Sequence, residues 1–104
     1  MKTLITRVEF PTGTVQVKID DKGVPSYEIK KNVAWDNIVW SEGLQKLAAQ
    51  TIAVCFGTLA QRGEVSRISI NRFLDAMPTE YTYKIFDINL RQDFYNKKII
   101  EDSL

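Results

Sequence analysis

Residues 51–57 read TIAVCFG, and this short apolar run decides how the rest of the chain is interpreted. A brief, wholly apolar run rich in β-branched residues is typical of a strand that is buried on both faces of a parallel sheet. Before it, Ser41 can cap the N-terminus of a helix, because Leu44, Leu47 and Ala48 follow at helical spacing. The sequence therefore predicts a helix that leads into a buried strand.

The alternation of helix and strand continues along the chain. Residues 64–78, EVSRISINRFLDAMP, place apolar side chains on roughly one helical stripe that Pro78 closes. Residues 83–86, YKIF, form a second apolar run, and residues 96–104, NKKIIEDSL, begin another helix. The order from residue 41 is α-β-α-β-α, which predicts an α/β fold with a parallel sheet. Two parallel strands need cover on both faces and edges, so the fold is expected to be truncated at both ends.

The first third of the chain is predicted to be a small β-sheet. Residues 12–23, TGTVQVKIDDKG, alternate apolar and polar side chains before a turn at Gly23, and residues 25–31, PSYEIKK, alternate again. This pattern indicates a hairpin, to which residues 3–10 can add a third strand. Its apolar face contains Val15, Val17, Ile19, Tyr27 and Ile29. That face packs either on the α/β part of the same chain or on the hairpin of a second copy, which would make a homodimer.

Composition excludes several classes of function. The chain of 104 residues is long enough for one small domain, and its net charge of +1 gives no electrostatic case for nucleic acid or an anionic membrane. Its N-terminus lacks the apolar core of a signal peptide, and no apolar run is long enough to span a bilayer. The sequence has no histidine, which excludes imidazole metal sites and histidine-based triads, and we expect no metal site. The single cysteine, Cys55, is expected to be a buried thiol in a protein of the reducing cytoplasm.

Polar residues follow both predicted parallel strands, where ligands bind in open α/β sheets. Arg91 has a fork of donors suited to phosphate or carboxylate, and Asn89 can both donate to and accept from a sugar hydroxyl. A solvated loop or a helix cap is the alternative for each residue. No GxGxxG or GxxxxGK[ST] motif is present to cradle a phosphate. The candidate residues after the two strands are Thr58, Gln61, Arg62, Asp87, Asn89 and Arg91.

Four segments together resemble the ribokinase-like carbohydrate kinases, the phosphofructokinase-B superfamily, and in particular the bacterial fructokinases. They are residues 11–38, 53–62 (AVCFGTLAQR), 70–77 (INRFLDAM) and 83–91 (YKIFDINLR). The most specific marks are Thr12-Gly13 and the D-x-N-x-R of residues 87–91. The resemblance implies a three-layer α/β/α fold with a β lid that two subunits often share. On this basis residues 1–34 would form the lid and residues 35–104 part of the α/β core, in one compact unit overall.

The resemblance also implies roles for individual residues. Arg91 would steady the negative charge of the sugar and of the transferred phosphoryl group, with Asn89 beside it. Lys30 stands at a lid position where related kinases often have arginine, and Glu28 shares its face. Two further candidate residues, Gln61 and Arg62, would follow the strand that lines the sugar pocket.

The sequence departs from the family at its catalytic machinery. The Asp-Thr-x-Gly-Ala-Gly-Asp motif, which supplies the general base and the anion hole, is absent, and the family's order would place it beyond Leu104. ATP and Mg²⁺ are implied for the full-length family, with no tight binding to this chain. The first hypothesis is therefore an internal segment of an ATP-dependent sugar kinase for fructose or a related sugar, inactive alone. The second is a stand-alone, non-catalytic binding or dimerisation module, and an intact small enzyme of another type is a third, weaker option.

Overall fold

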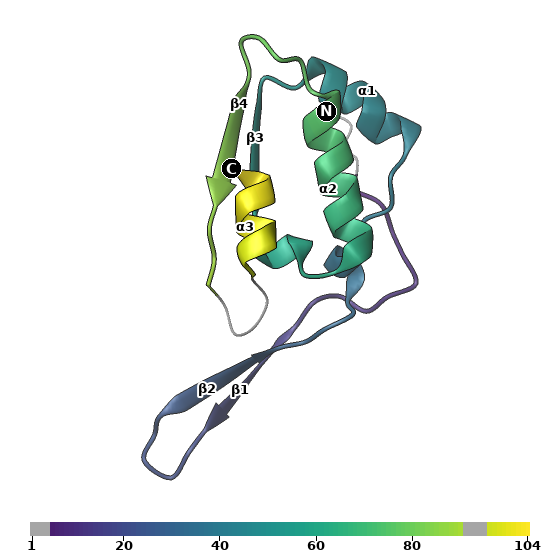
Figure 1. Ribbon diagram of the computed structural model, residues 1–104. Helices are drawn as coiled ribbons and strands as arrows, with labels where there is room; N and C mark the ends of the chain where they lie inside the picture. Colours follow the sequence, from purple (N-terminus) through teal and green to yellow (C-terminus); the bar gives the residue numbers. More distant parts are fainter. Residues whose placement is uncertain (1–4, 91–95) are drawn as a thin grey trace.

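The computed structural model describes residues 5–90 and 96–104 of the chain. Within them it forms a small mixed α/β domain with two two-stranded sheets and three α-helices (Figure 1). The first sheet is an antiparallel hairpin, and the second is a parallel pair within the helical part of the chain. The predicted mixture of α and β structure is therefore confirmed.

The hairpin consists of β1 (Val15–Ile19) and β2 (Pro25–Ile29), with Val17 opposite Tyr27. The side chain of Asp20 folds the turn, because its Oδ1 accepts hydrogen bonds of 2.9 Å from the backbone N–H groups of Lys22 and Val24. Gly23 takes a φ of +79°, as a residue without Cβ can do at little cost. Residues 5–10 are not in a strand, so of the two alternatives, a hairpin alone or a hairpin with a third strand, the described residues show the hairpin alone.

The apolar face of the hairpin lies open to solvent. Val15, Val17, Ile19 and Tyr27 are 52%, 53%, 71% and 61% exposed. The hairpin projects away from the helices (Figure 1), and the Cα radius of gyration is 15.9 Å, against about 13 Å expected for a compact chain of this length. The expectation that this face packs on the chain's own α/β part is therefore wrong.

The α/β part follows in the predicted order, α-β-α-β-α. Its elements are α1 (Glu42–Gln50), β3 (Ala53–Gly57), α2 (Glu64–Ala76), β4 (Tyr83–Asp87) and α3 (Lys97–Ser103). Two of the helices begin at side-chain caps: Ser41 Oγ accepts from the N–H of Leu44 at 3.2 Å, and Asn96 Oδ1 accepts from the N–H of Ile99 at 2.8 Å. The predicted cap at Ser41 is thus confirmed.

Strands β3 and β4 are parallel, with Cys55 opposite Ile85 and Phe56 opposite Phe86. The two phenylalanine rings stack with centroids 5.1 Å apart and are half-buried, whereas Cys55 and Ile85 on the other face are exposed. Only one face of this sheet is covered within the described residues. The predictions that β3 is buried on both faces and that Cys55 is a buried thiol are therefore wrong, because no second layer lies over that face in this part of the chain.

The covered side has a small apolar core reinforced by buried hydroxyl groups. Ser66, in α2, donates to the carbonyl of Trp35 at 2.7 Å and accepts from the N–H of Ile38 at 2.9 Å. Ser69, one turn later, donates to the carbonyl of Ile38 at 2.5 Å. These bonds hold the segment that follows the hairpin against α2. No helix in the described part of the chain is long and apolar enough to cross a membrane.

Candidate functional site

The carboxyl ends of β3 and β4 lie side by side, as the sequence predicted, since Gly57 pairs with Asp87. The next residue, Thr58, is fully buried and bridges to the other strand: its Oγ1 donates to the carbonyl of Asn89 at 2.7 Å and accepts from the N–H of Asn89 at 2.8 Å. A Cβ at Gly57 would lie only 3.0 Å from the carbonyl oxygen of Asp87, so the close approach of the strands depends on glycine. We call Gly57, Thr58, Asp87 and Asn89 the strand-end rim.

The side chain of Asn89 lies at this rim and donates from Nδ2 to Asp87 Oδ2 at 3.0 Å. Its partner in the predicted motif, Arg91, lies outside the described residues. The rim therefore presents a carboxylate and an amide that can accept from or donate to the hydroxyl groups of a ligand.

Gln61, in the short 3₁₀ turn after the rim, points into the protein. It is 2% exposed, and its Nε2 donates to the carbonyl of Gly57 at 3.1 Å and to Ser103 Oγ at 3.0 Å. Its observed contacts thus join the end of β3 to α3. Gln61 therefore lies close to the rim, but its side-chain amide is hydrogen-bonded within the protein.

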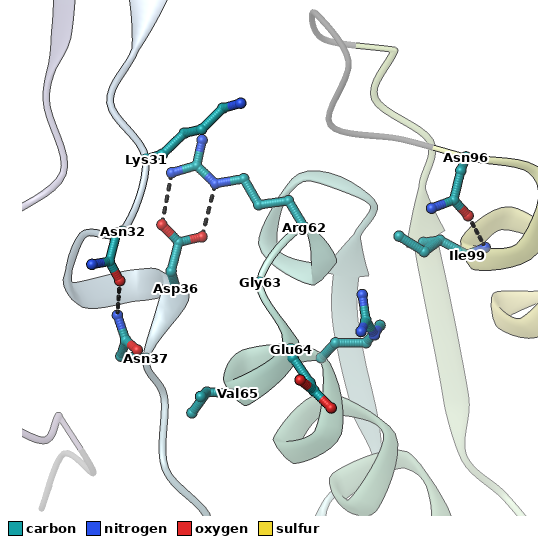
Figure 2. Close-up of a pocket in the computed structure, with 11 residues that line it drawn as sticks. Lys31, Asn32, Asp36, Asn37, Arg62, Gly63, Glu64, Val65, Asn96 and Ile99 are labelled. Carbon is teal, nitrogen blue, oxygen red and sulfur yellow. Dashed lines mark hydrogen bonds and ion pairs between the residues drawn. The ribbon is translucent and has the colours of Figure 1, made fainter.

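Arg62 ties the core to the base of the hairpin (Figure 2). Its guanidinium forms a two-pronged ion pair with Asp36, with Nε to Oδ1 and Nη2 to Oδ2 both at 2.8 Å, and Nη2 also donates to the carbonyl of Lys30 at 2.5 Å. The guanidinium lies 4.0 Å from the centroid of the Trp35 ring. The side chains of Arg62 and Asp36 are only 6% and 7% exposed, so this ion pair is desolvated.

The environment of Asp36 favours its charged form. Burial raises the pKa of this carboxyl group, but the hydrogen bonds from Arg62 and from the backbone N–H of Val33, together with the charge of Arg62, outweigh that effect and hold the pKa below its usual value. The carboxylate is therefore ionised at neutral pH and matches the fixed positive charge of the guanidinium.

The two predicted lid residues, Lys30 and Glu28, lie at the end of β2. Their side chains form an exposed ion pair of 3.6 Å. An exposed pair of this kind contributes little to stability, about 0–1 kcal/mol. Both side chains are therefore accessible to a ligand or to another chain.

A cavity of about 450 Å³ lies between the base of the hairpin, the first turn of α2 and the start of α3 (Figure 2). Its walls carry the Arg62–Asp36 pair and several residues that the sequence reasoning missed, among them Lys31, Arg67 and Asn96. These residues come from three separate segments, and no spacing in the sequence indicates that they meet. We call this space the hairpin-base cavity.

Comparisons with known proteins give no identification, since neither the protein-family models nor the curated proteins include a match to this chain. In residues 5–90 and 96–104, no three cysteine, aspartate or glutamate side chains come together in a group that could hold a metal ion. The candidate site therefore consists of the strand-end rim and the hairpin-base cavity.

Proposed function

We propose that this chain forms the lid and part of the three-layer sheet of a ribokinase-like sugar kinase, with the strand-end rim binding the sugar. The substrate class is fructose or a related sugar, and the chain by itself does not transfer phosphate. The observation that carries the proposal is the rim, where Thr58, Asp87 and Asn89 meet at the carboxyl ends of two parallel strands. Ligands of open α/β sheets bind at this position.

The hairpin gives a second line of support. A β-lid has to project from the core in order to cover a site, and β1 and β2 project in this way (Figure 1). Lys30 and Glu28 form an exposed ion pair at the base of this hairpin. The resemblance in residues 11–38 implies that these two residues belong to the lid of the family.

The described residues do not fit the remaining machinery of such a kinase. They bring together no carboxylate cluster for Mg²⁺, and the sequence has no glycine-rich anion hole for the phosphates of ATP. No step of phosphoryl transfer is therefore assigned to this chain. Those groups would have to come from further polypeptide.

A titration of the ¹⁵N-labelled chain with fructose, followed by NMR, tests the rim. We expect the backbone signals of Gly57, Thr58 and Asn89 to move, and Asn89→Ala to weaken the response because it removes the amide group at the rim. The matched control is Asn71→Ala, which removes an amide that donates within α2 at 3.0 Å. Absence of rim shifts at millimolar fructose would overturn the sugar-binding role.

An enzyme assay tests the second half of the proposal. The purified chain with ATP, magnesium and a sugar panel led by fructose should release no ADP above the background without sugar. Fructose-dependent ADP release by the chain would show that the missing base and anion hole are replaced by other residues. The claim that the chain is inactive alone would then be wrong.

A specific observation favours a second candidate function, self-association through the hairpin. The open face with Val15, Val17, Ile19 and Tyr27 is apolar, and burying one such side chain stabilises an assembly by roughly 1.5–3 kcal/mol. In this reading the chain is a dimerisation module. Two copies would pack their hairpins face to face, as sheets do at a spacing of about 10 Å.

Sedimentation velocity over a range of concentrations tests this candidate. A monomer–dimer equilibrium is expected, and Val17→Lys should abolish it by placing a charge on the apolar face. Gln16→Lys is the matched control, because the neighbouring residue of β1 points to the opposite face of the hairpin. A monomer at every concentration, or equal loss in both variants, contradicts association through this face.

A further inference from the structure

We draw no further inference here: the strongest candidate, the open face of the β3–β4 sheet on which Cys55, Tyr83 and Ile85 are exposed, is an unpartnered apolar surface, and nothing in the structure shows what covers it.

Discussion

Replacing Arg62 by methionine tests whether the buried ion pair holds the base of the hairpin to the core. The change removes both hydrogen bonds to Asp36, the bond to the carbonyl of Lys30 and the contact with the Trp35 ring. It also leaves the carboxylate of Asp36 buried without its counter-charge, which typically costs about 3–5 kcal/mol. Domains of this size have a total stability of about 5–15 kcal/mol, so the variant should retain only part of its stability.

Urea unfolding followed by far-ultraviolet circular dichroism at pH 7 measures this loss. Tryptophan fluorescence is a poorer probe, because the guanidinium lies 4.0 Å from the Trp35 ring and its removal changes the signal of the folded state. The matched control is Arg72→Met, which removes an exposed guanidinium 4.8 Å from the Trp40 ring and should cost about 1 kcal/mol or less.

A second variant distinguishes an unpaired charge from simple loss of packing. Adding Asp36→Asn to Arg62→Met removes the stranded charge and keeps an oxygen that can accept from the N–H of Val33, now 3.1 Å from Oδ2. The double variant should therefore be more stable than Arg62→Met alone. If Arg62→Met loses no more stability than Arg72→Met, the ion pair does not hold the fold together and this reasoning is refuted.

Three further predictions concern the same junction and the rim. The pKa of Asp36 is lower in the folded state than in the unfolded state, so its carboxylate stabilises the fold above about pH 4. This stabilisation is lost as the pH falls through the folded-state pKa. The urea midpoint should therefore fall less steeply with decreasing pH in Asp36→Asn than in the original chain. Gly13→Ala should destabilise the chain, since the new Cβ would lie 2.3 Å from Nε1 of Trp35 and force the ring away, and thermal unfolding measures the loss. Thr58→Val should cost about 1–3 kcal/mol in urea unfolding, because it removes both hydrogen bonds to Asn89.

Two of these predictions have a control substitution within the chain, and the third has an outcome that would contradict it. Thr82→Val removes an exposed hydroxyl that donates to the carbonyl of Pro78 at 2.8 Å, so it should cost much less than the change at Thr58. Gly23→Asn should be tolerated, because no atom lies within 4 Å of a Cβ there and asparagine adopts positive φ more readily than alanine. An acid dependence in Asp36→Asn identical to that of the original chain would contradict the assignment to that carboxyl group.

The sequence predicted the local elements well because short-range patterns decide them. The alternation in residues 12–31 gave the hairpin, and Ser41 marked the start of α1. The burial of β3 was predicted wrongly. An apolar run shows that a strand would be stabilised by a layer packed over it, but it does not show that such a layer is present. Cys55 is exposed for that reason.

The site was predicted less completely than the fold. The polar residues after β3 and β4 were found from the rule that parallel strands share an edge, and Thr58 and Asn89 do meet there. The partnership of Arg62 with Asp36, which lies 26 positions away, follows from how α2 packs on the segment after the hairpin. The spacing of those two residues in the sequence does not indicate that they form a pair. It does not indicate the cavity that they line either.

The arrangement of the two sheets has a consequence for the order in which the chain folds. Strands β1 and β2 are joined by a short turn, and hairpins of this kind form in about 1–10 μs. Strands β3 and β4 can pair only after the chain has closed a long loop that contains α2, and such non-local pairing is slower. The apolar face of the hairpin does not pack on the part of the chain that contains β3 and β4. Substitutions on that face should therefore leave the rate at which β3 and β4 pair unchanged.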